Sequence, residues 1–206
     1  MSIWTKSKIK EALAGSPAKL GIQPLLTEGQ INEVTIDLRL GYDFLVSVLT
    51  RDPSIDISAN AFDSQARLSA HFQETRRELG TPFVLYPNQL VLVSTLEYIS
   101  LPPNAYADVF PRSSYSKLGV GLGGMLQPGY RGCVPLELLN HGNVPVTLTV
   151  GSRICQIRIM DTVHDTNYHG QQEPRKYYGQ VRPTVSKAAG DIELQLLKSI
   201  AKNLDA

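Results

Sequence analysis

The feature of this sequence that most constrains its fold is a succession of short extended segments between residues 81 and 160, separated by turns. Apolar runs and alternations predict strands at 83–86, 90–95, 97–101, 105–110, 133–140, 144–150 and 154–160. The intervening turns contain Pro87-Asn88, Pro102-Pro103 and Gly151-Ser152. Because no helical pattern of about 10 to 15 residues separates the strands, an antiparallel β-sandwich or barrel is favoured over a βαβ nucleotide-binding fold.

Both flanks of this region carry weaker patterns. Residues 6–14 have the apolar spacing of a short helix, which Gly15 and Pro17 end. Residues 34–40 alternate with period two and 44–49 resume an extended pattern, so both are predicted strands. The polar stretch 50–80 is interpreted as an excursion from the core with a helical turn or two, not as a second domain. In the tail, apolar residues share one arc of a predicted helix that needs a surface to pack on: Ile192, Leu196, Leu197, Ile200 and Leu204.

The overall charge excludes several classes of partner. Twenty Lys and Arg against 19 Asp and Glu give a net charge of +1, and no long basic run is present. A duplex nucleic acid or an anionic membrane surface is therefore not expected as a partner. No apolar run approaches the ~20 residues of a membrane span and no signal peptide is evident, so a cytoplasmic protein is expected. Cys133 and Cys155 have no metal-ligand spacing around them, so we expect reduced core thiols and no zinc.

Two polar features inside the strand-rich region could carry chemistry. Arg112, Ser113, Ser114 and Lys117 open a glycine-rich stretch that runs to Gly132. Guanidinium, hydroxyl and backbone N–H groups can together donate to phosphate oxygens, although a plain polar loop between strands remains the alternative. Glu137 lies in the apolar strand 133–140. Burial there would raise its pKa, as a general acid or base requires, and a structural salt bridge is the equal alternative.

Asp37 and Arg39 lie in the alternating strand at 34–40. Their spacing predicts that they form its polar side. A functional role for them is the less favoured alternative.

In combination, these segments resemble the dCTP deaminase family, the deaminating branch of the trimeric dUTPase superfamily. The resemblance rests on SKIKEAL, VTIDLRLG, TPFVLYPNQLVLVSTLEYISLPP, PRSSYSKLGV, QPGYRGCVPLELLNHGNVPVTLTVGSRICQI and KYYGQ, which occur in a consistent order over residues 3–187. The family implies a mainly β, distorted β-barrel or jelly-roll-like fold of the dUTPase type. We accordingly expect one domain: a body at 1–160, a nucleotide-closing segment at 161–187 and a tail helix at 188–206.

The resemblance also implies an activity and a site. Deaminases of this family convert dCTP to dUTP and ammonia without zinc, as homotrimers with sites between subunits, and Mg²⁺ arrives with the triphosphate. Glu137 matches the catalytic glutamate, while Ser113 and Lys117 match residues that orient the attacking water. The implied substrate-binding residues are Arg112, Ser114, Gln127, Gln156, Tyr168, Lys176, Tyr177 and Gln180.

Three departures from the family pattern keep alternatives open. Lys117 stands where the family has an arginine, Gln127 stands where it has an aspartate, and the loop between Leu118 and Pro128 is about three residues short. Deamination of dCTP is the leading hypothesis because simple dUTPases lack the carboxylate at Glu137. Hydrolysis of dUTP or another dNTP to the monophosphate is the enzyme alternative. A nucleotide-binding regulator that keeps the fold without catalysis is the third hypothesis.

Overall fold

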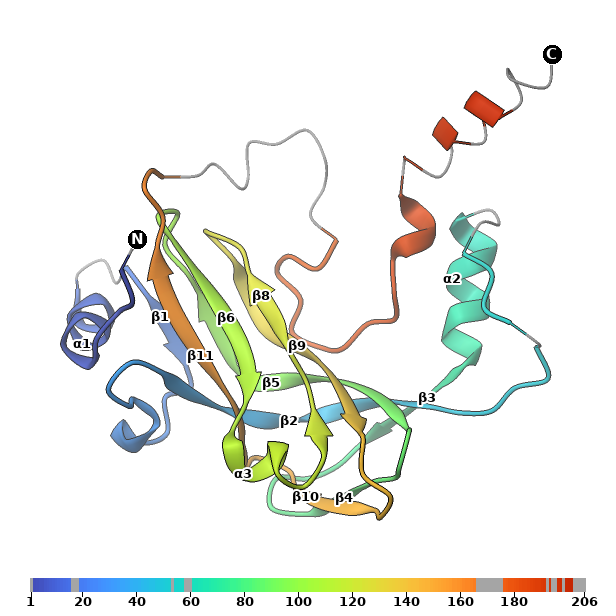
Figure 1. The fold of residues 1–206 in the computed structure, drawn as a ribbon, viewed down its shortest axis with the longest axis horizontal. Helices are drawn as coiled ribbons and strands as arrows, with labels where there is room; N and C mark the ends of the chain where they lie inside the picture. Colours follow the sequence, from blue (N-terminus) through green and yellow to red (C-terminus); the bar gives the residue numbers. More distant parts are fainter. Residues whose placement is uncertain are drawn as a thin grey trace.

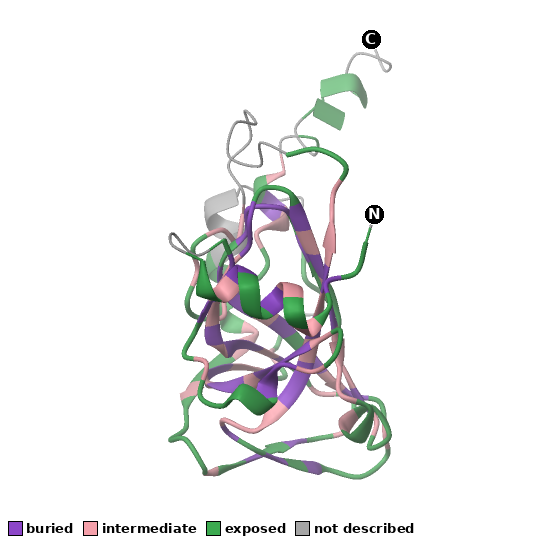
Figure 2. Cartoon of the chain, turned by 90° about the vertical axis from the view of Figure 1, so that its left-hand side faces the viewer, coloured by how far each residue is buried: buried purple, intermediate pink, exposed green. Residues whose placement is uncertain are grey.

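The computed structural model describes residues 2–15, 19–52, 54–57, 61–165, 176–191, 193, 196–197 and 199–201. Within these residues the protein is mainly β, with one large sheet that curls around an apolar interior (Figures 1 and 2). The strands are β1 (Gly21–Gln23), β2 (Ile36–Ser47), β3 (Phe72–Arg76), β4 (Pro82–Leu85), β5 (Leu90–Ser100), β6 (Ala105–Pro111), β7 (Val120–Gly121), β8 (Gly124–Leu126), β9 (Arg131–Asn140), β10 (Val146–Thr149) and β11 (Arg153–Asp161). The helices are α1 (Lys6–Ala14), η1 (Glu28–Gln30), α2 (Ala61–Ala70), α3 (Ser113–Ser116) and η2 (Ala188–Gly190).

The sheet order places distant parts of the chain side by side. The large sheet runs β7-β9-β5-β2-β11-β6-β8, with β1 paired to β5 and β3 paired to β2, and a separate two-stranded sheet joins β10 to β4. Every named strand pair is antiparallel. The expectation of a mainly β, barrel-like antiparallel fold is therefore confirmed.

Several boundaries differ from the sequence-based expectation. The predicted strands at 34–40 and 44–49 are one strand, β2, and those at 90–95 and 97–101 are one strand, β5. The polar excursion contains α2 and β3, and the glycine-rich stretch contains the short strands β7 and β8. In the tail, residues 193, 196–197 and 199–201 are helical, and Leu196, Leu197 and Ile200 are exposed.

The pairing of β2 with β5 is irregular at the middle of the sheet. The register shifts between Leu40 and Phe44 on β2, and β5 shifts against β9 between Ser94 and Tyr98. Gly41 lies at this point, where a Cβ atom would collide with the carbonyl oxygen of Ser94. Only glycine lets the two backbones approach so closely.

Two buried side chains take the place of the missing strand bonds. Glu97 accepts a hydrogen bond from the backbone N–H of Arg39 at 2.8 Å, and the Gln30 amide donates to the Asp37 carbonyl at 3.1 Å and to Glu97 at 2.9 Å. Glu97 and Gln30 are fully buried. Burial raises the pKa of Glu97, while the hydrogen bonds from Arg39 and Gln30 oppose that shift. These side chains therefore supply hydrogen-bond partners to the backbone of Asp37 and Arg39, where β5 no longer pairs with β2.

The N-terminus is attached to the far end of β11 through a single carboxylate. Asp161 accepts hydrogen bonds from Ser2 at 2.6 Å, from the Trp4 indole at 2.7 Å and from Lys8 at 2.6 and 2.8 Å. Partial desolvation alone would raise the pKa of Asp161, but these donors together lower it to about 2. The ionised carboxylate is therefore the form that the folded protein prefers.

Replacement of Asp161 by Asn should destabilise the protein at neutral pH. Because the folded-state pKa lies below its usual value, the contribution of Asp161 to stability is present above about pH 4 and is lost as the pH falls towards 2. We expect a loss of about 1 kcal/mol in the free energy of unfolding at pH 7, since solvent screens this partly exposed group. Urea unfolding at pH 7 and pH 3 measures the loss, with Asp165→Asn as control. An equal loss at both pH values would contradict this assignment.

Candidate functional site

Arg112 lies at the end of β6, where the sheet brings it beside two candidate residues of other strands. In the antiparallel register, Gln156 of β11 is opposite both Phe110 of β6 and Asp37 of β2. Directly opposed residues point to the same face of a sheet. Accordingly, the Arg112 Nε lies 3.4 Å from the Asp37 carboxylate, and Thr35 donates to the Gln156 side-chain oxygen at 3.1 Å.

Asp37 is not on the solvent side of its strand. Its side chain is 3% exposed and lies 3.3 Å from a second guanidinium, that of Arg153. Asn32 donates to its other oxygen at 3.1 Å. Asp37 thus faces polar partners, but it is buried because both faces of β2 are covered in this region and these partners compensate the carboxylate.

The residues after Arg112 form the single turn α3. Backbone N–H groups of Ser116 and Lys117 donate to the carbonyl oxygens of Arg112 and Ser113, at 3.0 and 3.1 Å. The Tyr115 hydroxyl donates to Ser152 and ties this turn to the barrel. The side chains of Ser113, Ser114 and Lys117 are exposed. The turn thus presents hydroxyl and ammonium groups next to Arg112.

Gln127 follows β8 at the end of the glycine-rich stretch. Its side chain is exposed, and its carbonyl oxygen accepts a hydrogen bond from the backbone N–H of Tyr130 at 3.0 Å. The Tyr130 hydroxyl is buried and donates to the carbonyl oxygen of Cys133. The turn between β8 and β9 is therefore fixed while Gln127 faces outward.

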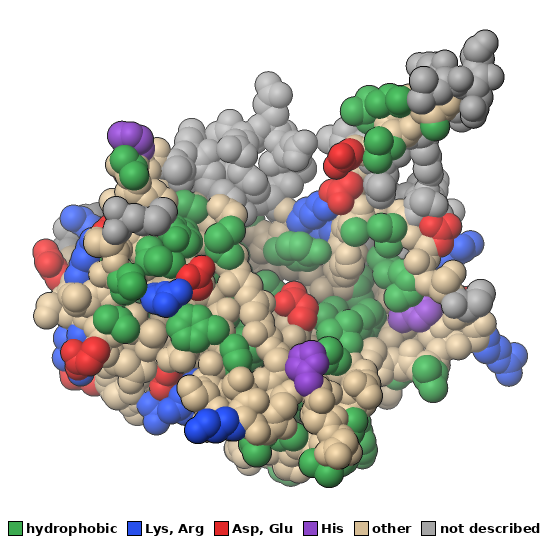
Figure 3. All heavy atoms as spheres, in the orientation of Figure 1, with side chains coloured by type: hydrophobic (Ala, Val, Ile, Leu, Met, Phe, Trp, Pro, Cys, Tyr) green, Lys and Arg blue, Asp and Glu red, His purple; other side chains and the backbone are tan. Residues whose placement is uncertain are grey.

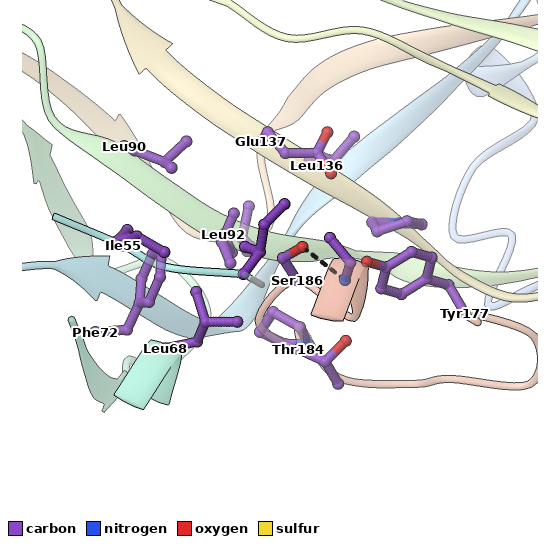
Figure 4. Close-up of a pocket in the computed structure, with 15 residues that line it drawn as sticks. Ile55, Leu68, Phe72, Leu90, Leu92, Leu136, Glu137, Tyr177, Thr184 and Ser186 are labelled. Atoms are coloured by element: carbon purple, nitrogen blue, oxygen red, sulfur yellow. Dashed lines mark hydrogen bonds between the residues drawn. The ribbon is translucent and has the colours of Figure 1, made fainter. Parts of the chain in front are cut away.

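Glu137 stands at a largely apolar cavity of about 530 Å³ on the opposite side of β9 from the core. Figure 4 shows Glu137 on β9 with Tyr177 to one side and Ile55, Leu68 and Phe72 to the other, and Figure 3 shows apolar side chains gathered in the hollow beside α2. The cavity is lined by Ile55, Ile57, Leu68, Phe72, Leu90, Leu92, Val93, Pro135, Leu136, Glu137, Tyr177, Pro183, Thr184, Ser186 and Ala188. Although the Glu137 side chain is exposed at the rim, desolvation by these neighbours raises its pKa. A carboxyl group in such surroundings keeps its proton to a higher pH than a fully solvated one, which suits a group that both accepts and releases a proton.

The segment after residue 175 is fastened to β9 by its backbone. The Gln180 carbonyl accepts a hydrogen bond from the Cys133 N–H at 2.8 Å, and the Gly179 N–H donates to Arg131 at 2.7 Å. Lys176 forms an ion pair with Asp191. This course brings Tyr177 into the cavity with Glu137. Tyr168 lies outside the described residues.

The described residues therefore form two groups on one chain. One group lies at β6 and β11 and consists of Arg112, the exposed side chains of α3 and Gln156. The other group lies at β9 and consists of Glu137 and Tyr177. Strands β9 and β11 are separated by β5 and β2, which is three strand spacings, or about 14 Å along the sheet. Neither Ser113 nor Lys117 lines the Glu137 cavity as the described residues form it.

Three polar residues near these groups carry no clear signal in the sequence. The contact between Asp37 and Arg153 depends on a register shift in β11, and the burial of Glu97 depends on the irregular pairing of β5. Periodicity alone does not locate such irregularities. A glutamate between Leu96 and Tyr98, in an otherwise apolar strand, is the one visible hint.

No cluster of three or more His, Cys, Asp or Glu side chains lies in a metal-binding arrangement within the described ranges. Cys133 and Cys155 are buried free thiols whose pKa values desolvation raises, that of Cys133 to about 11. Among the helices of the described part, none has the length and apolar character needed to cross a bilayer.

Comparison with known proteins gives a consistent result. A family model described as dCTP deaminase-like matches residues 3–162. A "dCTP deaminase, dUMP-forming" from Methanobrevibacter smithii is 33% identical over 200 residues, which cover 95% of this chain and all of the relative. A "dCTP deaminase" from Haloarcula marismortui is 37% identical over 169 residues, covering 80% of this chain and 84% of the relative.

A solved structure agrees with the sequence comparison. The crystal structure of 2'-deoxycytidine 5'-triphosphate deaminase from Agrobacterium tumefaciens superimposes with a TM-score of 0.58 and 25% identity, covering 76% of this chain and 48% of that chain. The described barrel therefore shares its fold with a solved dCTP deaminase. The chain belongs to the dCTP deaminase-like family, and the resemblance stated from its motifs is confirmed.

Substitution of Gly132 by Ala should loosen the segment around Gln180. Gly132 has φ +144°, and an added Cβ would lie 2.8 Å from the Gln180 carbonyl oxygen and 2.9 Å from the Tyr130 hydroxyl. Both collisions fall where the segment is bonded to β9, so we expect faster hydrogen exchange at Gly179 and Cys133. Gly124→Ala, where a Cβ meets no atom within 4 Å, is the matched control. Unchanged exchange in Gly132→Ala would show that the segment is held by other contacts.

Proposed function

We propose that this protein deaminates dCTP, replacing the 4-amino group with oxygen to give dUTP and ammonia. The observation that carries the proposal is the environment of Glu137, a carboxylate with a raised pKa beside an apolar cavity in a dCTP deaminase-like chain. Its relatives from Methanobrevibacter and Haloarcula, which are named as dCTP deaminases, are similar to it over most of the chain. The reaction is a hydrolysis, and in this proposal the protein needs no zinc.

The proposed reaction is balanced by one proton carrier. Ionised Glu137 takes a proton from water as the water oxygen attacks C4 of the cytosine ring, and passes it to N3, which leaves a tetrahedral C4 that carries a hydroxyl and an amino group. Glu137 then takes the hydroxyl proton and gives it to the amino group, so that the C4–N bond breaks, ammonia leaves and the C4 carbonyl forms. A raised pKa serves both steps, because the same group must accept and release a proton. Ser113 and Lys117 orient the water in this proposal.

The triphosphate would be held by the groups around Arg112. Arg112, Ser114 and Gln156 are the proposed phosphate contacts, and Lys176 joins them from the closing segment. In this proposal Mg²⁺ arrives as part of the nucleotide, since Asp37, the carboxylate in contact with Arg112, is already shared by two guanidinium groups. The remaining residues are proposed to contact the base and the sugar and to close the site: Gln127, Tyr168, Tyr177 and Gln180.

We propose a homotrimer whose sites lie between subunits. The support is the separation of the two groups by about 14 Å along the sheet of one chain. Ser113 and Lys117 follow Arg112 directly, so a second copy is the simplest way to bring them to Glu137. The proposed location is the cytoplasm, where two buried free thiols fit a reducing compartment.

Release of dUMP in place of dUTP is a second candidate, since some relatives are named dUMP-forming. One assay separates the outcomes. Purified protein is incubated with Mg²⁺ and either dCTP or dUTP, and ammonia, pyrophosphate and nucleotide products are followed. Ammonia with dUTP supports the proposal, ammonia together with pyrophosphate and dUMP supports the second candidate, and pyrophosphate from dUTP alone supports a dUTPase. Binding without either product would leave only a regulatory role and would refute the proposal.

Glu137→Gln should reduce ammonia release by at least ~10²-fold, because the amide cannot accept the proton of the attacking water. Nucleotide binding should be retained, since the shape of the side chain is kept. In the wild type, kcat should rise with pH through the raised pKa of Glu137, because the ionised form is the base. Product assays over a pH series measure both effects.

Glu74→Gln is the matched control, as Glu74 is an exposed glutamate on β3. It should leave both the rate and its pH dependence unchanged. Near wild-type activity in Glu137→Gln would remove Glu137 from the mechanism.

A further inference from the structure

Arg153, at the first position of β11, is turned towards Asp37 by a break in the strand register. Arg153 pairs with Arg39 of β2, whereas Cys155 pairs with the adjacent residue Leu38. One extra residue, Ile154, is thus inserted into β11 at this point. Such a bulge redirects the side chains on either side of it.

The bulge makes Asp37 the shared partner of two arginines from different strands. Asp37 Oδ2 lies 3.4 Å from Arg112 Nε and 3.3 Å from Arg153 Nη1. Arg112 also donates through Nη1 to the carbonyl oxygen of Arg153 at 3.3 Å, and Arg153 donates through Nη1 to that of Gly29 at 2.9 Å. Each guanidinium is therefore held at two points.

The charge and exposure of this group leave it suited to an anion. Two guanidinium groups and one carboxylate carry a net charge of +1. Asp37 is 3% exposed, while Arg112 and Arg153 are 34% and 35% exposed, so the uncompensated charge faces solvent. The contacts of Arg153 use only Nη1, which leaves Nε and Nη2 outside them. A planar donor fork held in this way matches the oxygens of a phosphate group.

We infer that Arg153 is a second guanidinium that binds the triphosphate of the nucleotide, beside Arg112, and that Asp37 is the positioning residue for both. This inference rests on the proposed nucleotide site at Arg112. It adds a contact that the motif around Arg112 does not contain, because Arg153 comes from another strand. Asn32, which donates to Asp37, orients that carboxylate from its other oxygen.

The test compares binding of dCTP with binding of deoxycytidine, which has no phosphate. Titrations are made in the Glu137→Gln background, so that turnover does not disturb them. Arg153→Met should weaken dCTP binding by about 10- to 100-fold, the effect of one charged hydrogen-bonding group, and change deoxycytidine binding by less than about threefold. Arg153→Lys should recover part of the dCTP affinity, because it restores the charge without the fork.

Arg158→Met is the matched control. Arg158 lies on the same strand, pairs with Asp108 at 3.0 Å and is similarly exposed, but it is five residues, or about 16 Å, further along. The Arg158→Met variant should bind dCTP and deoxycytidine with the same affinities as the Glu137→Gln parent. Unchanged dCTP affinity in Arg153→Met, or an equal loss of dCTP and deoxycytidine, would overturn the inference.

The role of Asp37 is tested by a double-mutant cycle. Asp37→Asn should weaken dCTP binding in the parent and weaken it less when Arg153 is already Met, because the residue acts through that arginine. Equal losses in both backgrounds would overturn the positioning role. Should Asp37→Asn fail to fold, the Arg153 variants still decide whether Arg153 binds phosphate. Ammonia release by the wild type is scored separately, so loss of the deamination proposal would not be mistaken for loss of this one.

Discussion

The hydrogen bonds of buried Glu97 are the constraint on which the rest of the structure depends. Strand β2 pairs with β5 along its C-terminal half, but β5 diverges from the residues before Leu40. Glu97 and Gln30 supply the bonds that this backbone would otherwise lack. An unpaired buried backbone group costs about as much as a lost hydrogen bond. The two side chains therefore allow one continuous strand, β2, to pair with β5 along its C-terminal part and with β11 along its N-terminal part.

This one irregularity serves both groups of candidate residues. On one side of it, Asp37 of β2 pairs with Gln156 of β11, and its carboxylate contacts Arg112 and Arg153. On the other side, Thr95 accepts a hydrogen bond from the backbone N–H of Val134, and the preceding residue of β9, Cys133, donates to the carbonyl oxygen of Gln180 in the segment after residue 175. Tyr177 reaches the Glu137 cavity from that segment. The irregular middle of β5 thus lies between the proposed phosphate-binding group and the proposed proton carrier.

The sequence alone predicts a good part of this arrangement. Turn residues and apolar runs predicted most of the strands, and the ordered motifs identified the family. The carboxylate in the apolar strand at Glu137 could also be singled out, because a charge among apolar residues is costly wherever it is buried. The bulge at Ile154 and the joining of two predicted strands into β5 could not be predicted, since they depend on which strands meet. For the same reason the burial of Asp37 was missed. The role of each site residue remains a prediction.

The central claim is that Glu137 of one copy works with the Arg112 group of another. Subunit complementation tests it most directly: Glu137→Gln and Arg112→Met chains carrying different tags are co-expressed, and assemblies containing both are purified. If the site lies between subunits of a trimer, about one of the three sites in each mixed assembly joins an intact Arg112 to an intact Glu137. Ammonia release from dCTP should then rise well above that of either variant alone. Activity no higher than the sum of the two separate variants would contradict the account.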